Sequence, residues 1–528
     1  MRVDAQHATI TRCLARAALT LPHHTACEFM ADTLSYATLQ RRVNQLANEL
    51  LALGVTQGDR VGIYMPKSIN TPVALHGIMA AGAAYVPLDP SAPADRIASI
   101  INACGIRIIV SAPAQQRALK TLAKLDTPLT TVIGADVGWH ESWRDVPFER
   151  LEARSSDAPD IEINESDLAY IIFTSGSTGT PKGIVHTHRS CLSFSQWAVD
   201  EYQLTSADRM SNHAPLHFDL SIMDYFSAVI VGATTIIVPE EYTKLPASYS
   251  QLIETARLTV LYTVPFALIQ LLLRGALKQR DFRHLRYAIF GGEPFPTAHL
   301  RALMDHLPHV RFDNIYGPAE VNGVSHFTVQ SLDTDQESVP IGPIADHAKS
   351  LIVDSDDRMR SPGETGELLV HAPSMMVGYW QDEVLTQRSL YRSADGDVYF
   401  RTGDLVQADE QGVMRFVGRK DRQVKMRGYR VELDEIELAL TAINAVEEGA
   451  AYVVQTEPGV NEIRAEVTLN ASAEPAALLQ ALKRTLPWYA VPAALSVRQA
   501  FVRTTTGKID RRELALQAQA ALNAHHAP

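Results

Sequence analysis

The segment YIIFTSGSTGTPKGIVH, residues 170–186, limits what this chain can fold into more than any other stretch. It begins with apolar residues typical of a buried strand, continues through hydroxyl-bearing residues and glycines over 174–180, and then reaches Pro181, Lys182 and Gly183. Glycines let successive backbone N–H groups turn toward one point, and hydroxyls add further donors. Together with the Lys182 cation, this pattern predicts a phosphate-binding loop. It is not a Walker A loop, because no Gly-Lys-Ser/Thr closes it; a polar surface turn is the plainer alternative.

Length, charge and cysteine usage exclude several classes of protein. The chain has 528 residues, which favours two or more domains, and its net charge of -12 gives a nucleic-acid partner no electrostatic support. The four cysteines form no Cys-x-x-Cys pair, so neither a zinc site nor a disulfide framework is predicted, and a reducing cytoplasm is the expected location. The N-terminus lacks the pattern of a signal peptide, and no run of eighteen apolar residues predicts a membrane span.

Strand-like and helix-like segments alternate along most of the chain. Residues 34–55 place apolar side chains at helical spacing, while 60–65, 106–111 and 129–134 have the composition of short strands. This alternation predicts a parallel α/β sheet. After Glu432, the pattern changes to a helix over 433–447, strands near 449–455 and 462–469, and a helix over 475–486. These elements predict a small second domain of about one hundred residues.

Several further motifs carry chemistry, and each also has a plain structural explanation. Asp219 in His217-Phe218-Asp219 is a candidate ligand for a buried ammonium group, or the cap of a helix that begins at Leu220. The pair Gly291-Gly292 allows a flat group to approach the backbone, or simply makes a tight turn. The remaining motifs are DNIYGPAEVN (313–322), Thr402-Gly403-Asp404, GRKDRQVKMRGYRVE (418–432) and Thr506-Gly507-Lys508, for which turns and a charged hairpin are the alternatives.

Taken in order, these segments resemble the signature motifs of the adenylate-forming superfamily, which includes acyl-CoA synthetases, luciferases and nonribosomal-peptide adenylation domains. The resemblance covers almost the whole chain. It implies an α/β fold with a large N-terminal domain of α/β subdomains plus a β-barrel-like subdomain, and a small mobile C-terminal α+β domain. The implied boundaries are 1–418 for the core domain, 419–422 for a hinge centred on Asp421, and 423–528 for the small domain.

The resemblance implies two half-reactions that use ATP and Mg²⁺. A carboxylate attacks the α-phosphorus of ATP to give an acyl-adenylate, and a thiol then attacks the adenylate carbonyl. The catalytic residues it implies are Lys508, Glu320, Thr174 and His217, with Glu320 as the Mg²⁺ ligand, Tyr316 stacking on adenine and Asp404 accepting both ribose hydroxyls. The implied ATP and AMP contacts are Thr174, Ser175, Gly176, Ser177, Thr178, Gly179, Lys182, Gly291, Gly292, Glu293, Asn314, Ile315, Tyr316, Gly317, Asp404, Phe416, Arg419 and Lys508.

The sequence around Asp219 points to an amino acid as the acid substrate. In the amino-acid-activating branch the loop reads Phe-Asp-x-Ser, and its aspartate pairs with the α-amino group. The implied pocket resembles that of stand-alone ligases that load L-proline onto a carrier protein, and Gly291 and Gly323 are expected to enlarge it. The residues at its implied positions are Asp219, Leu220, Met223, Tyr262, Ile289, Gly291, Ile315, Gly323, Val324 and Lys508.

Other functions share parts of this pattern. A D-alanine–carrier-protein ligase has the same Phe-Asp-Leu-Ser, a CoA ligase uses CoA as the thiol, and a non-catalytic nucleotide-binding protein retains the fold. Intact Lys508, Glu320 and Asp404 argue against the last of these. No Gly-x-Asp/His-Ser-Leu pattern follows Lys508, so the expected acceptor is a separate phosphopantetheinylated carrier protein, or CoA, with no membrane or nucleic-acid partner.

Overall fold

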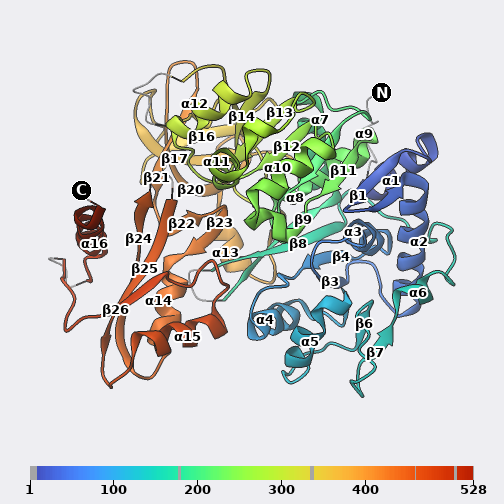
Figure 1. Cartoon of the computed structure of the whole chain (residues 1–528), viewed down its shortest axis with the longest axis horizontal. Helices are drawn as coiled ribbons and strands as arrows, with labels where there is room; N and C mark the ends of the chain where they lie inside the picture. The colour runs from blue at the N-terminus through green and yellow to red at the C-terminus, as the bar shows by residue number, and fades with distance from the viewer. Residues whose placement is uncertain (1–8, 177–179, 333–337, 458–459, 505–507, 527–528) are drawn as a thin grey trace.

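The computed structural model describes residues 9–176, 180–332, 338–457, 460–504 and 508–526. Its larger part contains two eight-stranded sheets and one five-stranded sheet, and its C-terminal part lies at one end of the molecule (Figure 1). Within the described residues, no helix combines the length and apolar character that a membrane crossing requires.

The first eight-stranded sheet carries the predicted phosphate loop. Its interior strands β8, β4, β3, β5 and β6 are parallel, and β9 pairs antiparallel with β8. The strands in spatial order are β18 (Gly378–Tyr379), β9 (Lys182–Thr187), β8 (Leu168–Thr174), β4 (Ala84–Pro87), β3 (Arg60–Tyr64), β5 (Ile108–Ser111), β6 (Thr131–Ile133) and β7 (Arg144–Val146).

The second eight-stranded sheet carries the predicted pocket residues. Its strands β11, β10, β12, β13 and β14 are parallel and almost wholly buried, and the sequences of β12 and β13 are mostly apolar, as is typical of buried parallel strands. The strands in spatial order are β15 (Ser325–Val329), β14 (Arg311–Tyr316), β13 (Tyr287–Gly291), β12 (Val260–Thr263), β10 (Arg209–Asn212), β11 (Thr234–Ile237), β1 (Thr25–Phe29) and β2 (Asp32–Ser35).

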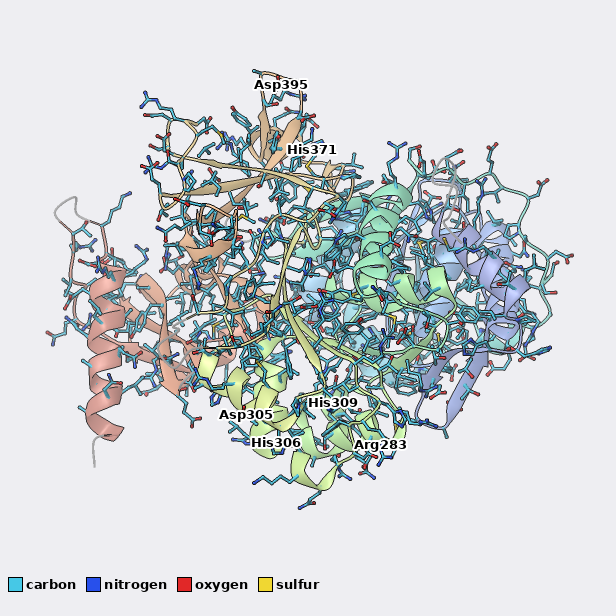
Figure 2. All side chains as sticks on the ribbon, turned by 90° about the horizontal axis from the view of Figure 1, so that it is seen from above. Arg283, Asp305, His306, His309, His371 and Asp395 are labelled. Carbon is cyan, nitrogen blue, oxygen red and sulfur yellow. The ribbon has the colours of Figure 1, made fainter. Side chains whose placement is uncertain are left out.

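A third, antiparallel sheet follows in the chain, at the place where the sequence predicts a β-barrel-like subdomain. Seen from above, this sheet with His371 and helix α12 with Asp305 and His306 lie on opposite sides of the molecule (Figure 2). Its strands are β16 (Lys349–Val353), β17 (Thr365–His371), β20 (Val398–Ala408) and β19 (Leu390–Arg392), with β21 (Met414–Arg419) pairing to β20.

The C-terminal part has its own hydrophobic core. The hairpin of β22 (Gln423–Met426) and β23 (Tyr429–Glu432) leads into helix α14 (Leu433–Thr441), whose residues Ile436 and Leu440 are fully buried against the last sheet. That sheet has the order β24 (Val446–Glu457), β25 (Val460–Leu469) and β26 (Ala494–Val497), with α15 (Pro475–Thr485) and α16 (Arg511–His526) packed beside it.

Helices surround the two large sheets, and their sequences explain where they begin. In α2, for example, the Ser35 hydroxyl accepts a hydrogen bond from the Thr38 backbone N–H at 3.2 Å, and Leu39, Val43 and Leu46 form the buried stripe. The other helices of the larger part are α1 (Ile10–Thr20), α3 (Thr71–Ala80), α4 (Ala94–Cys104), α5 (Gln116–Leu122), α6 (Phe148–Leu151), α7 (His188–Glu201), α8 (Leu220–Ile222), α9 (Ala228–Val231), α10 (Pro246–Thr255), α11 (Pro265–Arg274), α12 (Thr297–His306) and α13 (Glu383–Arg388).

The predicted α/β class and the smaller C-terminal domain are confirmed, and one predicted element was too long. The helix expected over 433–447 ends at Thr441, because Val446 already pairs with Leu469 in the β24–β25 ladder. The boundaries at 418 and 422 stay predictions. Helix α16 was not predicted.

Candidate active site

A cavity lies where strands from both large sheets end and where the β22–β23 hairpin covers them. It brings together most of the motifs that the sequence analysis singled out. Its lining residues are Ile172, Phe173, Thr174, Ser175, Phe194, His217, Phe218, Asp219, Leu220, Tyr262, Gly291, Gly292, Ile315, Tyr316, Gly317, Ala319, Asn322, Gly323, Lys425, Gly428, Tyr429, Arg430 and Tyr489.

The predicted phosphate loop connects two antiparallel strands. Residue Thr174 of β8 pairs with Lys182 of β9, so the loop turns back into a strand where a Walker A loop enters a helix. The Thr174 hydroxyl is buried and has no hydrogen-bond partner among the described residues, and the Ser175 hydroxyl donates to the Arg430 backbone carbonyl at 3.3 Å. Both residues line the cavity, whereas Ser177, Thr178 and Gly179 lie outside the described residues. The unpartnered hydroxyl therefore offers a donor to an anionic group in the cavity.

The Lys182 side chain stands beside the loop with its charge partly compensated. Its Nζ lies 4.0 Å from an oxygen of Glu432 on β23. Burial, followed by the nearby Arg430 charge, lowers the pKa of Lys182 to about 8, against the opposing effect of Glu320 and Glu432. The lysine is therefore cationic at neutral pH and loses its charge in mildly alkaline solution.

This titration predicts a pH dependence of ATP binding. Because the pKa is about 8, the protonated fraction of Lys182 falls about ten-fold between pH 7 and pH 9, and the KM for ATP should rise by about the same factor. The Lys182→Arg variant should show no such rise, because a guanidinium stays charged throughout. The measurement is ATP–pyrophosphate exchange at several pH values, with Lys278→Arg as a surface control. The same alkaline rise in Lys182→Arg would assign the titration to another group.

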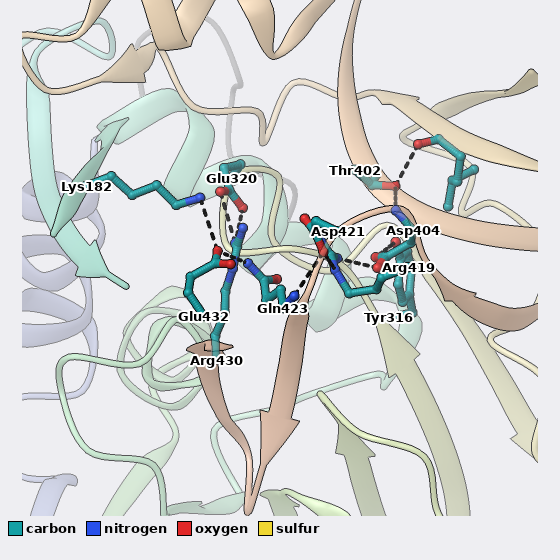
Figure 3. Close-up of polar contacts among 11 residues, drawn as sticks. Lys182, Tyr316, Glu320, Thr402, Asp404, Arg419, Asp421, Gln423, Arg430 and Glu432 are labelled. Carbon is teal, nitrogen blue, oxygen red and sulfur yellow. Dashed lines mark hydrogen bonds and ion pairs between the residues drawn. The ribbon is translucent and has the colours of Figure 1, made fainter. Parts of the chain in front are cut away.

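Glu320, the predicted Mg²⁺ ligand, is fully buried and already neutralised by a cation of this chain. Arg430 Nη1 donates to both of its oxygens, at 3.0 Å and 2.8 Å (Figure 3). The Tyr379 hydroxyl donates to Oε1 at 2.8 Å. Burial alone would raise the pKa of Glu320, but Arg430 and Lys182 outweigh it and lower that pKa to about 2. The side chain is therefore an anion whose position is fixed by β23.

The donor set around Glu320 fits a Mg²⁺ ion that arrives with phosphate. No three His, Cys, Asp or Glu side chains gather into a metal cage within the described ranges. Mg²⁺ is commonly bound through one or two carboxylates together with substrate phosphates and water, so an ionised, buried Glu320 is a suitable protein ligand. In the present arrangement the Arg430 guanidinium uses the same oxygens, so the ion and Arg430 exclude one another there.

The predicted ribose carboxylate belongs to a connected chain of polar groups. The Tyr316 hydroxyl donates to Asp404 Oδ2 at 2.5 Å, and Arg419 Nη1 donates to Asp404 Oδ1. The same Arg419 donates from Nε and Nη2 to the two oxygens of Asp421, at 2.6 and 2.7 Å (Figure 3). Arg419 thus joins the predicted ribose site to the predicted hinge residue.

The other predicted nucleotide contacts differ in where they lie. Gly291, Gly292, Ile315 and Gly317 line the cavity. Several others are not among the lining residues, and the side chains of two of these bond to backbone groups of the protein. Glu293 accepts hydrogen bonds from the backbone N–H groups of Phe266 and Gly428 at 2.9 and 3.1 Å, and Asn314 donates to Pro340 O at 2.7 Å. The remaining ones outside the lining are Gly176, Lys182, Asp404, Phe416, Arg419 and Lys508.

Asp219 lies in the predicted pocket for the acid substrate, and the structure does not support its alternative role as a helix cap. It precedes α8 but its side chain makes no capping hydrogen bond, and no ion pair to it is formed within the described part of the chain. Burial raises the pKa of Asp219, which the Lys425 cation partly opposes. A half-buried carboxylate in this situation is stabilised by an ammonium group that binds beside it.

The remaining pocket residues come from α8 and the helical turn that follows it, from strands β12, β13 and β14, and from the segment between β14 and β15. Leu220, Tyr262, Ile315 and Gly323 line the cavity, whereas Met223, Ile289 and Val324 are buried behind it. The expected enlargement by glycine has a different cause. A Cβ at Gly291 would lie 2.3 Å from Ile315 O, and one at Gly323 would lie 2.7 Å from Phe194 and Ile315. These two glycines make room for neighbouring protein atoms as much as for a substrate.

Lys508 does not join the other predicted catalytic groups in this arrangement. It is exposed, and its carbonyl accepts a hydrogen bond from the Thr504 N–H at 2.8 Å, next to the bridge between Arg503 and Ile509. The hairpin residues Lys425, Gly428 and Tyr429 line the cavity instead. A role for Lys508 in chemistry thus requires the C-terminal part to take a second position.

Sequence reasoning missed part of the lining. The missed residues are Phe194, Asn322, Lys425, Tyr429, Arg430 and Tyr489. The motif at 418–432 signalled the hairpin but not its position over the cavity. Tyr489 and Phe194 have no local signal, because only the packing of distant elements brings them there.

Comparison with known proteins agrees with this geometry. The family model described as AMP-binding enzyme matches residues 14–380. An L-proline–[L-prolyl-carrier protein] ligase of Pseudomonas fluorescens is 33% identical over 503 residues, covering 94% of this chain and 97% of that protein. The protein of the same name from Streptomyces coelicolor is 35% identical over 522 residues, covering 94% and 96%. The solved adenylation domain AlmE of Vibrio cholerae, in complex with glycyl-adenosine-5′-phosphate, has a TM-score of 0.85 at 24% identity, covering 98% of this chain and 99% of that one.

Proposed function

Because the chain belongs to the AMP-binding enzyme family, we propose that this ATP-dependent, AMP-forming ligase activates a small amino acid and passes it to the phosphopantetheine thiol of a separate carrier protein. L-proline is the first candidate, supported by the names of two relatives that match over nearly their full lengths. The observation that carries the amino-acid assignment is Asp219, a half-buried carboxylate in the cavity with neither a cap nor an ion-pair partner among the described residues. In this proposal it receives the α-ammonium group.

In the first half-reaction the substrate carboxylate displaces pyrophosphate from the α-phosphorus. Negative charge grows on the phosphate oxygens, and fixed donors and cations at that point lower the barrier. Thr174 and Lys182 hold the phosphates, Asp404 orients the ribose, and Lys508 approaches the reacting bond when the C-terminal part moves. A bound Mg²⁺, held by Glu320, would supply further charge compensation.

In the second half-reaction a thiol attacks the adenylate carbonyl and AMP leaves. The hairpin residues Gly428 and Tyr429, which line the cavity here, support assigning the present arrangement to this step. Asp421 is then the pivot between residues 1–418 and 423–528.

A panel of acids in an ATP–pyrophosphate exchange assay tests the substrate class. We expect exchange with L-proline above that with the other proteinogenic amino acids and with D-alanine, and none with fatty or aryl acids. Strongest exchange with D-alanine would favour the D-alanine–carrier-protein ligase. Exchange only with acids that lack an α-amino group would overturn the role of Asp219. Comparing CoA with a phosphopantetheinylated carrier protein as the acceptor then separates a CoA ligase from a carrier-protein ligase.

The hinge is tested by a backbone substitution at Asp421. Asp421→Pro fixes one backbone dihedral, so it should keep pyrophosphate exchange and lose thioester formation. Asp421→Ala is the matched control, because it removes the carboxylate bonded to Arg419 but leaves the backbone free. Both variants losing the two half-reactions to the same extent would contradict a hinge at this position.

A further inference from the structure

A carboxylate and an imidazole face each other at one wall of the cavity, outside the predicted phosphate and ribose sites. Asp89 follows strand β4, and its Oδ1 is held by the Ser91 backbone N–H at 2.8 Å and the Ser91 hydroxyl at 2.6 Å. This local turn directs Oδ2 toward His217, whose Nε2 lies 3.8 Å away. Both facing atoms are buried, and neither makes a hydrogen bond to any residue that the structure describes. The gap is about 1 Å longer than a charge-assisted hydrogen bond, so a small ring movement closes it.

His217 lies where the acceptor thiol of the second half-reaction would enter the cavity. A series of aromatic rings leads toward it from the C-terminal part: Trp488 is 45% exposed, Tyr489 stacks on Tyr429 at 3.9 Å, and Tyr429 meets Phe218 edge-on at 4.6 Å. Phe218 in turn contacts the His217 ring at 5.4 Å. His217 thus lies between the pocket of Asp219 and the junction of the two parts of the chain, where an acceptor can enter.

We propose that His217 is the general base for the thiol in the second half-reaction and that Asp89 is its positioning residue. This inference rests on the proposed function. When Nε2–H is donated to Asp89, the lone pair of the imidazole is on Nδ1, the ring nitrogen left for the cavity. The thiol proton passes to Nδ1 as the C–S bond forms. The bond between the carbonyl carbon and the AMP phosphate oxygen breaks, AMP leaves with that electron pair, and the imidazolium beside Asp89 then releases its proton to water.

The charged surroundings agree with a neutral imidazole that is poised to accept a proton. Burial is the largest effect and lowers the pKa of His217, while the Asp89 carboxylate opposes it. The other ionisable groups facing this pair are Glu240, Arg96, Lys67, Tyr429 and Tyr489. The negative charges of Asp89 and Glu240 favour the imidazolium form of His217. The positive charges of Arg96 and Lys67 disfavour it. Without Asp89, protonation of the ring becomes harder.

The test separates the two half-reactions in the full-length enzyme, with pantetheine as the thiol and ATP–pyrophosphate exchange as the second readout. A general base contributes about 100-fold or more, so His217→Gln should slow thioester formation by about that factor. Asp89→Asn should slow thioester formation about ten-fold more than it slows exchange, and Asp95→Asn, an exposed aspartate of α4, is the matched control.

A pH profile distinguishes positioning from a merely structural role. Loss of the Asp89 charge lowers the pKa of His217, so the rising limb of the thioester rate should move to lower pH in Asp89→Asn and disappear in His217→Gln. Equal loss of both half-reactions, or an unmoved limb, would overturn the assignment of Asp89. If the unmodified enzyme shows exchange but makes no thioester with pantetheine, CoA or a phosphopantetheinylated carrier protein, the proposed transfer step itself is wrong. A normal thioester rate in His217→Gln would overturn the assignment of His217 as the general base and leave the proposed transfer step in place.

Discussion

Replacing Lys508 by alanine should lower the rate of amino-acid adenylation by about 100-fold or more, the loss typical of removing one placed charge-stabilising donor. The expected effect is large even though Lys508 is exposed and does not line the cavity in this structure. The reason is that the β22–β23 hairpin now lines the cavity, and in our proposal its departure lets the C-terminal part bring Lys508 to the reacting phosphate.

The matched control for this variant is Lys483→Ala, which removes another exposed lysine of the C-terminal part. Exchange of pyrophosphate measures adenylation, and thioester formation from chemically prepared aminoacyl-AMP measures the second step. Lys508→Ala should affect the first measurement far more than the second. Unchanged exchange would remove Lys508 from the chemistry and leave no reason for a second position of the C-terminal part.

Replacing Asp219 by alanine should raise the KM for the amino acid by about 30-fold or more, because a buried ammonium without its partner costs about 2–5 kcal/mol. The pocket should also lose its discrimination against acids that lack the amino group. For L-proline, the comparison acid is cyclopentanecarboxylate, which has the same ring size and no nitrogen. The ratio of their kcat/KM values in pyrophosphate exchange should therefore fall toward one.

Asp200→Ala, on the exposed side of α7, is the control for Asp219→Ala. A pH series adds an independent check. Burial raises the pKa of Asp219 above its ordinary value, so acidification protonates the carboxylate and should weaken amino-acid binding in the unmodified enzyme but not in the variant. If the KM of Asp219→Ala stays near that of the unmodified enzyme, the ammonium is held elsewhere.

Local sequence predicted the motifs and many of the elements correctly. Helix 34–55 was expected and α2 spans Tyr36–Ala52, because its apolar spacing and the Ser35 cap are both local features. The same holds for the strands expected near 449–455 and 462–469, which are β24 and β25. The order of the strands was not predictable in this way. Strand β18 completes the first sheet beside β9 although the two are separated by most of the second sheet in the chain.

The arrangement of the site depended still more on distant contacts. The residues 418–432 were recognised as functional, yet nothing local says that Arg430 meets Glu320, 110 positions earlier. The same limit applies to Asp89 and His217, since neither residue has a sequence neighbour that signals the other. Such pairs arise only when the C-terminal part and both large sheets meet.

The charges on strand β23 have a consequence for the binding and release of the nucleotide. Its Arg430 satisfies Glu320 and its Glu432 lies beside Lys182, so the charges meant for a nucleotide are matched internally. Arrival of a nucleotide is therefore an exchange of one set of partners for another, with a smaller net gain than capture by bare charges would give. When the anionic products leave, Arg430 and Glu432 return to Glu320 and Lys182. This return lowers the free-energy cost of product release between turnovers.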